Sequence, residues 1–570
     1  MEKIIELKKL FKKYDLDGYL IPKNDEFFGE YVAEEEDRLK FITNFSGSYG
    51  FALILKDKNY LFVDGRYTLQ AKRESGKNFN IITMPKLYPY NILKSNKLRI
   101  GFDPKLYTQR MINYLFKKKK LISINVNLVD KIWKKKKVNN ISKFFILKKS
   151  DTGQDSKSKI TKISRIFRKK KIDYQFISAP ENIAWLLNLR GEDSNFSPIP
   201  NSYMILKKNN IINLFCNPKK INNKLKKKLR NVKIKDINEI EIFLDKLKNK
   251  KVQIDQLSCS VFFKDILKKN NMVIEQIDPT YYLKSVKNKI EVKNSYKSHI
   301  YDGVALTKFL FWLKKNFQKK KITEVSAQNK LLQFRKKNKY FKFPSFPTIS
   351  GSGSNGAIIH YRANSKTNKT LKKKEIYLVD SGGQYNFGTT DVTRTISFGN
   401  NNKRIKDIFT RVLKGHIAVA NFEIKNSTNG HKIDQAARKP LKQVNLSYPH
   451  GTGHGVGYFL NVHEGPVGFS KRNKTKLCEG MIISNEPGYY KAGQFGIRIE
   501  NLIVVKKINK SYVFDNLTMV PIDRNLIEKK ILNTTELNWI NNYHEQVYNI
   551  LNKYMFGADL KLLKESCSKI

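Results

Sequence analysis

The sequence is poor in acidic residues. It contains 50 Asp and Glu against 109 Lys and Arg, a formal net charge of +59 over 570 residues. Lysine runs at 117–120, 134–137, 226–228 and 319–321 are spread through the first part of the chain. They lack the interleaved aromatic residues of single-strand binders, and no zinc-finger spacing or basic leucine zipper accompanies them. We therefore expect solvated, lysine-rich surfaces, and the scattered charge argues against nucleic-acid binding as the main function.

Cysteine and long apolar runs are also scarce. The four cysteines, Cys216, Cys259, Cys478 and Cys567, are far apart, which excludes a disulfide or zinc-finger framework and predicts a reducing compartment. No run approaches the roughly 18 apolar residues of a membrane span. Residues 1–22 have no continuous apolar block and no small-residue cleavage site, so we expect no secretory signal. These absences predict a soluble, cytoplasmic protein without a membrane partner.

Several common catalytic motifs are missing. The Gly/Ser-rich stretch 350–356 lacks the Gly-Lys-Ser/Thr ending of a phosphate loop. No His-Glu-x-x-His helix and no Gly-x-Ser-x-Gly elbow occurs. A hydrophobic content of 40% is nevertheless enough to build several cores and excludes disorder for most of the chain.

The first half alternates between strands and helices. Residues 1–152 contain an amphipathic helix with apolar residues at Ile4, Leu7, Phe11 and Tyr14, followed by strands at 19–21, 51–55 and 60–63. A polar linker is expected at 150–156.

Residues 153–284 repeat that order. They contain a helix at 159–171 and strands at 174–177, 203–206 and 211–216. The pattern predicts two α/β domains and suggests a duplicated module.

The pattern of apolar and polar residues changes at about residue 285. A long helical pattern covers 290–317, and six of the eight histidines fall between His360 and His463. Clustering of a scarce titratable residue points to a site in this third domain, 285–508. The remaining stretch, 509–570, contains a helical pattern over 537–554 and is expected to pack on the third domain.

Acidic residues stand at the ends of predicted strands in this third domain. Asp380 ends the strand 375–380, and Asp391 begins the strand 391–398 across a turn at 385–388. If these strands pair, the two carboxylates lie side by side and need a shared proton or a cation.

A second strand pair repeats this arrangement. Glu486 ends a strand that begins at 481, and one returning strand is expected over 495–505, with Arg498 and Glu500 on the same face. Between the two pairs lies the glycine-rich stretch 450–457, which contains His450 and His454, and His463 follows it.

Four carboxylates and an imidazole suit a pair of hard divalent ions. Oxygen ligands favour manganese-like ions, while one histidine also admits Co, Fe or Zn. Two such ions about 3.5–4 Å apart can hold a bridging hydroxide as nucleophile and polarise a carbonyl group.

At these residues the sequence resembles the three-domain Xaa-Pro aminopeptidases (aminopeptidase P) of the pita-bread metallopeptidase family M24. The strings with this likeness are DSGGQYNFGTTDVTRT at 380–395, HGTGHGVG at 450–457, NVHEGP at 461–466, NEPGYY at 485–490 and GIRIEN at 496–501. SGSYGFALI at 46–54, DGRY at 64–67 and ENIAWLLNLRG at 181–191 resemble the family's N-terminal domains. The resemblance implies an α/β multidomain fold. It has creatinase-like domains at 1–152 and 153–284, a pita-bread catalytic domain at 285–508 and a packed C-terminal extension at 509–570.

The resemblance also implies roles for individual residues. Two divalent ions, Mn²⁺ or else Co, Zn or Fe, would be held by Asp380, Asp391, His454, Glu486 and Glu500, with Asp391 and Glu500 bridging. Glu486 would also shuttle protons. His360 and His463 would stabilise the oxyanion and receive the leaving nitrogen. His450 would line the proline pocket, and Arg498 would position acidic partners.

The implied substrates are peptides with proline in the second position, and the implied assembly is a homodimer. The proline preference depends on the resemblance, because prolidases and methionine aminopeptidases share much the same ligands. Two alternatives therefore stay open: a prolidase restricted to dipeptides, and a pita-bread binding protein that has lost its metals and binds RNA or acidic partners through its basic surface. All five ligand residue types are present, which favours an enzyme.

Overall fold

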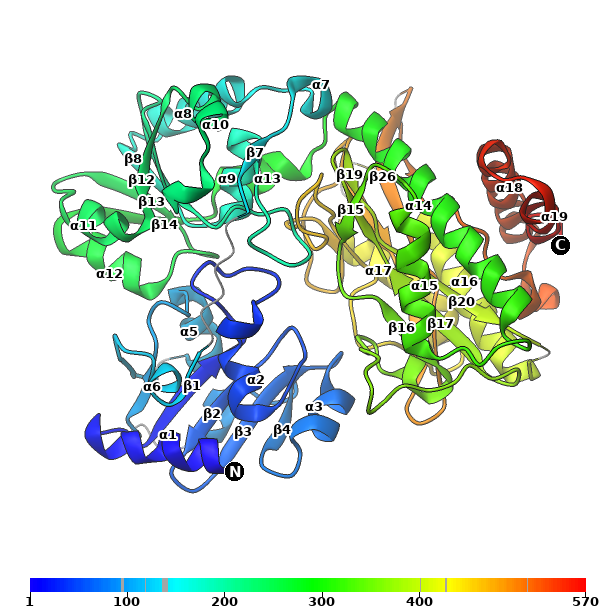
Figure 1. The fold of residues 1–570 in the computed structure, drawn as a ribbon, viewed down its shortest axis with the longest axis horizontal. Coiled ribbons are helices and arrows are strands. Elements are labelled where there is room, and N and C mark those ends of the chain that lie inside the picture. Colours follow the sequence, from blue (N-terminus) through cyan, green and yellow to red (C-terminus); the bar gives the residue numbers. More distant parts are fainter. Residues whose placement is uncertain (94–96, 118, 136–141, 400, 426–427, 510) are drawn as a thin grey trace. The chain divides into compact units, whose positions relative to one another are not determined.

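The computed structural model describes residues 1–93, 97–117, 119–135, 142–399, 401–425, 428–509 and 511–570. The lysine runs at 117–120 and 134–137 therefore lie partly outside the described residues. The described chain forms two compact units. The first contains Met1–Lys149 and Gln154–Tyr281, and the second contains Ser150–Gly153 and Tyr282–Ile570 (Figure 1). No helix of the described residues is long and apolar enough to cross a membrane.

The first unit contains two six-stranded sheets with the same topology. The first sheet has the order β4-β3-β2-β1-β5-β6, and the second has the order β12-β11-β10-β8-β13-β14. In each sheet the two central antiparallel pairings are flanked by parallel pairings. The suggestion of a duplicated module is confirmed at the level of strand pairing.

These strands follow the predicted segments closely. Those of the first sheet are β1 (Gly18–Pro22), β2 (Phe51–Leu55), β3 (Asn59–Asp64), β4 (Asn80–Met84), β5 (Ile100–Phe102) and β6 (Leu121–Ser123). Those of the second sheet are β8 (Tyr174–Ile177), β10 (Tyr203–Lys207), β11 (Ile212–Cys216), β12 (Val232–Asp236), β13 (Lys251–Asp255) and β14 (Met272–Gln276). Helix α1 (Glu2–Lys13) buries Ile4, Leu7 and Phe11 against the first sheet, as its apolar spacing predicts.

The prediction of a polar linker at 150–156 is wrong, because most of this stretch is helical and part of it is hydrogen-bonded within the second unit. Residues of this stretch form the helical turn α7 (Lys149–Thr152) and the start of α8 (Ser156–Lys169). The Asp151 carbonyl accepts hydrogen bonds from Tyr458 Oη at 2.6 Å and Asn294 Nδ2 at 3.0 Å. The Thr152 carbonyl accepts one from Asn288 Nδ2 at 2.8 Å. Side chains distant in sequence thus satisfy the backbone of a segment whose composition is typical of a loop.

The second unit packs helices around several small sheets. The strands that position the site are β16 (Ile349–Ser352), β17 (Ile376–Ser381) and β20 (Val392–Ser397) in one sheet, and β23 (Ile482–Asn485), β26 (Asn501–Ile508) and β27 (Ser511–Asn516) in another. Shorter pairs are β24 (Gly488–Lys491) with β25 (Phe495–Arg498), and β21 (Gly453–His454) with β22 (Gly468–Phe469). The strands β15 (Phe341–Pro344), β18 (Gly383–Tyr385) and β19 (Gly388–Thr389) form a third small sheet.

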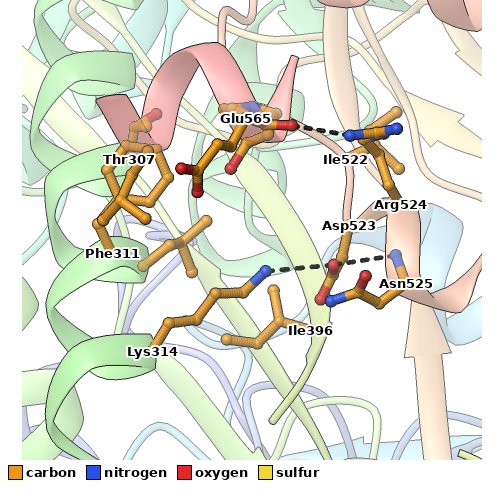
Figure 2. Close-up of a pocket in the computed structure, with 13 residues that line it drawn as sticks. Thr307, Phe311, Lys314, Ile396, Ile522, Asp523, Arg524, Asn525 and Glu565 are labelled. Carbon is orange, nitrogen blue, oxygen red and sulfur yellow. Dashed lines mark hydrogen bonds and ion pairs between the residues drawn. The ribbon is translucent and has the colours of Figure 1, made fainter. Parts of the chain in front are cut away.

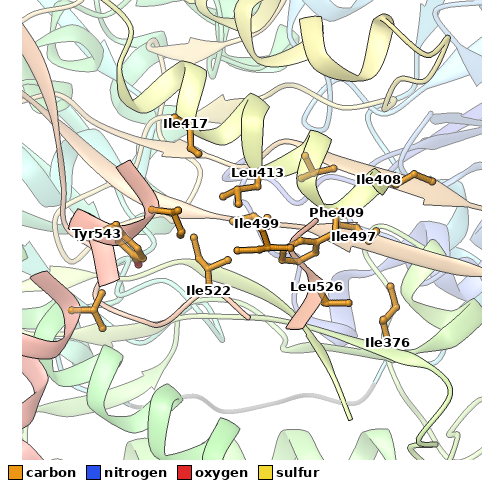
Figure 3. Packing of buried hydrophobic residues seen from close by; sticks show 14 of the residues in the cluster. Ile376, Ile408, Phe409, Leu413, Ile417, Ile497, Ile499, Ile522, Leu526 and Tyr543 are labelled. Atoms are coloured by element: carbon orange, nitrogen blue, oxygen red, sulfur yellow. The ribbon is translucent and has the colours of Figure 1, made fainter. Parts of the chain in front are cut away.

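The helices of this unit bury its apolar clusters. They are α14 (Lys289–Asn316), α15 (Glu324–Lys336), α16 (Lys403–Ala420), α17 (Gly430–Lys442), α18 (Thr534–Leu551) and α19 (Gly557–Ser566). The largest cluster joins α16, β25 and α18 through residues such as Leu413, Ile497 and Tyr543 (Figure 3). The C-terminal helices α18 and α19 (red in Figure 1) contact α14 and therefore pack on this unit.

One predicted strand is divided in two. The alternating pattern over 495–505 predicts a continuous strand, but β25 ends at Arg498 and β26 starts at Asn501. β25 pairs with β24, whereas β26 pairs with β23 and β27. Glu500 therefore lies in the break between two sheets instead of inside a ladder.

Candidate metal centre

The paired strands β17 and β20 bring the first two acids together. Asp380 lies opposite Thr393 in the antiparallel register, and Asp391 directly precedes β20. Both side chains are buried, and their Oδ1 atoms have no hydrogen-bond partner among the described residues. Two buried carboxylates with unsatisfied oxygens form a site that favours a cation.

His454 and Glu486 come from separate segments. The Nε2 atom of His454 lies 3.5 Å from Asp391 Oδ2 and 3.5 Å from Glu486 Oε1. Nδ1 of His454 is 2.9 Å from the Gly455 carbonyl oxygen, which can only accept, so Nδ1 is the donor and Nε2 faces the two carboxylates. Gly453 permits this arrangement, because a Cβ there would lie 1.9 Å from the Ser484 carbonyl oxygen on β23.

Glu500 completes the cluster from the break between β25 and β26. Asp391, His454 and Glu500 each place one ligand atom within 4.8 Å of the other two. Thr393 Oγ1 donates to Glu500 Oε2 at 2.7 Å. The structure thus brings together acids from four chain segments, as the sequence predicts for the strand ends.

The acids of this cluster raise one another's pKa. Burial, followed by the charges of Asp380 and Glu486, raises the pKa of Asp391 well above its usual range. Burial, followed by the charge of Asp391, does the same to the pKa of Glu500. Without a cation, these groups share protons to limit repulsion.

Arg498 balances part of this negative charge. Its Nη2 donates to Asp380 Oδ2 at 2.6 Å, and its Nε donates to Thr393 Oγ1 at 3.0 Å. Its Nη1 donates to Tyr490 Oη at 2.6 Å, and that oxygen lies 2.9 Å from Nε2 of His450. Arg498 and Tyr490 therefore link His450 to Asp380.

The other two predicted histidines lie on loops. His463 is exposed, and its ring centroid is 4.2 Å from that of His454. His360 is half-buried and follows the short helix η4 (Gly353–Ala357), which packs on β25. The contact is close, because a Cβ at Gly496 would lie 1.8 Å from the Gly356 carbonyl oxygen. The loop with His360 therefore rests against the strand that ends at Arg498.

A buried acid that the sequence analysis missed holds this loop. Glu324, the first residue of α15, accepts hydrogen bonds from the Ser352 amide at 2.7 Å, the Lys369 amide at 2.9 Å and Tyr361 Oη at 2.8 Å. Asn355 Nδ2 also donates to both of its oxygens. Tyr490 was missed as well. Its place in the string NEPGYY, four residues after Glu486, is the available sequence signal.

Family models match nearly the whole length of the chain in consecutive segments. Residues 294–507 match metallopeptidase family M24, and 510–570 match the C-terminal region of that peptidase family. Residues 3–131 and 134–291 each match a creatinase/prolidase N-terminal domain.

Individual relatives cover the same span. The chain is 37% identical to a probable Xaa-Pro aminopeptidase P of Laccaria bicolor, over 100% of this chain and 93% of the relative. It is 38% identical to Xaa-Pro aminopeptidase 1 of Dictyostelium discoideum, over 96% and 92% of the two chains. The crystal structure of an X-prolyl aminopeptidase from Caenorhabditis elegans superposes with a TM-score of 0.95 at 30% identity, covering 100% of this chain and 99% of the other. That protein is described as a cytosolic enzyme with a dinuclear active site.

The fold and these matches define a metallopeptidase of family M24 with creatinase-type N-terminal domains. Within that family, the chain belongs to the Xaa-Pro aminopeptidases. The predicted family and fold class are confirmed.

Proposed function

We propose that this chain is a metal-dependent aminopeptidase that hydrolyses the N-terminal Xaa-Pro bond of peptides. The observation that supports this most is the buried cluster of Asp391, His454 and Glu500, with Asp380 and Glu486 beside it. These five residues fit two divalent ions, with Asp391 and Glu500 bridging, because the cluster is acidic and has unsatisfied buried oxygens. When bound, two ions, Mn²⁺ by preference and Co, Zn or Fe as alternatives, would polarise the carbonyl and hold a bridging hydroxide as nucleophile.

The side chains around the cluster have distinct proposed roles. Glu486, whose Oε1 accepts from Ser484 Oγ at 3.1 Å, is the proposed proton shuttle. His463 and His360 are proposed to bind the oxyanion and the leaving imino nitrogen. His450 lines the pocket for the proline ring. Arg498 orients Asp380 and Thr393 by charge-assisted hydrogen bonds.

Proline in the second position suits such a site. An Xaa-Pro bond is a tertiary amide without an N–H, so a peptidase that needs that donor cannot bind it. A site that polarises the carbonyl oxygen does not need the donor. The names of the relatives from Laccaria bicolor and Dictyostelium discoideum support the same substrate class.

Organisation and location are part of the proposal. We propose domains at 1–152, 153–284, 285–508 and 509–570; the family models match four segments in the same order but with the first boundary near residue 132 and the second near 292. A cytoplasmic homodimer is proposed, and the description of the Caenorhabditis elegans relative as cytosolic supports that location. Sedimentation equilibrium of the purified chain tests the dimer, and a monomer at all concentrations contradicts it.

The test is release of arginine from Arg-Pro-Pro by the chelator-stripped chain, with and without added Mn²⁺. Cleavage restored by the metal supports the aminopeptidase. Cleavage of Ala-Pro but not of the tripeptide indicates a prolidase. If neither peptide is cleaved with Mn²⁺ or with Co²⁺, the enzymatic proposal is refuted. The alternative of a binding protein that uses its basic surface is then favoured.

Two substitutions test the proposed bridging ligands. Asp391→Asn or Glu500→Gln should abolish metal loading and turnover, because each removes a bridging charge. Asp407→Asn on α16 is a matched control, since this acid forms only a part-exposed pair with Arg411. Near-normal activity of both ligand variants contradicts the dinuclear assignment.

A further inference from the structure

Arg394 is a buried cation held by neutral groups. This residue of β20 is 1% exposed. Its guanidinium donates to Glu500 O at 2.6 Å, Thr393 O at 2.9 Å, Pro521 O at 3.1 Å, Val520 O at 2.7 Å, Asn501 Oδ1 at 2.8 Å and Tyr543 Oη at 2.9 Å. All six acceptors are neutral: four backbone carbonyl oxygens, one amide oxygen and one phenol oxygen.

Glu500 depends on β20 for its position. It lies between β25 and β26, outside any strand ladder. Its amide donates to the Thr393 carbonyl at 3.2 Å, and its carbonyl accepts from Arg394. Its carboxylate accepts from Thr393 Oγ1 at 2.7 Å. These three bonds replace the ladder and fix both the backbone and the side chain of the proposed bridging ligand.

The C-terminal extension supplies half of the acceptors around Arg394. They are the carbonyl oxygens of Val520 and Pro521 and the phenol oxygen of Tyr543 on α18. Tyr543 belongs to the same apolar cluster as Ile499, which precedes Glu500 in the sequence (Figure 3). Its ring stacks on Trp539 with centroids 5.3 Å apart.

The segment after Pro521 is fastened independently of Tyr543. It borders a cavity of about 330 Å³ between α14, β20 and α19 (Figure 2). There Lys314 Nζ lies 3.2 Å from Asp523 Oδ1, and Asp523 Oδ2 accepts from the Ser397 amide at 2.9 Å. Arg524 Nη1 donates to the Glu565 carbonyl at 2.8 Å. The backbone after Pro521 therefore keeps these bonds when the Tyr543 hydroxyl is removed, whereas the Val520 carbonyl loses the bond that Tyr543 Oη donates to it at 2.8 Å.

We propose that Tyr543 is a positioning residue of the metal centre. Through Arg394 it holds the peptide group of Glu500, so the C-terminal extension forms part of the support of the site. This inference rests on the proposed function, in which Glu500 bridges two ions. Residues that orient metal ligands typically change metal affinity by about 10–100-fold, and we expect about tenfold for Tyr543→Phe because it acts through one intermediate residue.

The experiment is a titration of Mn²⁺ into the chelator-stripped full-length chain, with free Mn²⁺ followed by electron paramagnetic resonance. Tyr543→Phe should bind Mn²⁺ about tenfold more weakly than the unaltered chain. Tyr548→Phe is the matched control. Tyr548 lies on the same helix, and its hydroxyl has no hydrogen-bond partner among the described residues. Its affinity should match that of the unaltered chain.

Thermal unfolding of the stripped variants separates positioning from stability. A lower melting temperature of Tyr543→Phe with unchanged Mn²⁺ affinity overturns the inference. If Tyr543→Phe does not fold, Arg394→Lys replaces it, since lysine keeps the charge but cannot donate to all these acceptors, and unchanged affinity again overturns the inference. Absence of Mn²⁺ binding to the unaltered chain refutes the proposed function itself, and this result is distinguishable from the others.

Discussion

The carboxylate of Glu324 provides a sharp test of how the loop with His360 is held. It is fully buried and accepts bonds from Ser352, Asn355, Tyr361 and Lys369. Glu324→Gln replaces one acceptor oxygen by an NH₂ group. If Oε1 is replaced, the Ser352 amide loses its acceptor, while Asn355 keeps its bond to Oε2. If Oε2 is replaced, the Tyr361 hydroxyl and the Lys369 amide lose theirs.

The expected magnitude follows from these contacts. A hydrogen bond to a charged group contributes roughly 1.5–3 kcal/mol, so one to two lost bonds lower the free energy of opening the loop by about 1.5–6 kcal/mol. Since about 1.4 kcal/mol corresponds to a factor of ten, amides in 350–361 should exchange at least about tenfold faster with deuterium. Exchange followed by mass spectrometry of this segment measures the effect, because local opening is defined even where global unfolding of a multidomain chain is not two-state.

Glu375→Gln is the matched control for this prediction. Glu375 accepts from Ser352 Oγ at 2.9 Å and is half-buried, so its loss should change exchange by less than about tenfold. Turnover of Arg-Pro-Pro should fall in Glu324→Gln while Mn²⁺ content stays unchanged, because the loop with His360 is displaced but the ligands are not. Exchange within threefold of the unaltered chain would refute the reasoning.

Two further predictions concern protons. Binding of Mn²⁺ to the stripped chain should release protons and strengthen as pH rises, because burial and neighbouring charges raise the pKa of Asp391 and Glu500; calorimetry in buffers of different ionisation enthalpy measures the release. Burial lowers the pKa of His299 from 6.5 to about 4, so the native state binds fewer protons than the unfolded chain between these values. Stability should therefore fall as pH drops from 6.5 to 4, by about 3 kcal/mol from this group, and His299→Asn should reduce the slope of melting temperature against pH.

Each of these predictions has a clear contrary result. Binding heats that do not depend on the buffer would show that the acids are already ionised without metal. Identical slopes for His299→Asn and the unaltered chain would show that this imidazole does not titrate in that window.

The ends of the strands were predictable from local pattern. Asp380 follows the apolar run 376–379, and Asp391 begins an alternating strand. One acid at a strand end is common, and only the combination with the other acids and the histidines indicates a site. The break before Asn501 was not predictable, because the residues on both sides alternate alike and the choice of strand partner is made by distant segments.

The roles of Arg394 and Glu324 as supports of the site were not predictable for the same reason. Arg394 looks like one more residue of an alternating strand, yet it contacts Tyr543, which is 149 positions away. Glu324 looks like an ordinary acid in the first turn of a helix, where such residues are common. Their roles come from tertiary contacts, which composition and periodicity do not encode.

The five proposed ligands are spread along the chain between Asp380 and Glu500, and only folding brings them together. An ion held by them binds the folded chain and not the unfolded one, so it adds about 2.7 kcal/mol of stability when its free concentration is 100 times the dissociation constant. A shortage of the metal ion would then lower the stability of the chain as well as its turnover. A cell short of the ion would hold a chain that opens more often, is degraded sooner and is present in fewer copies.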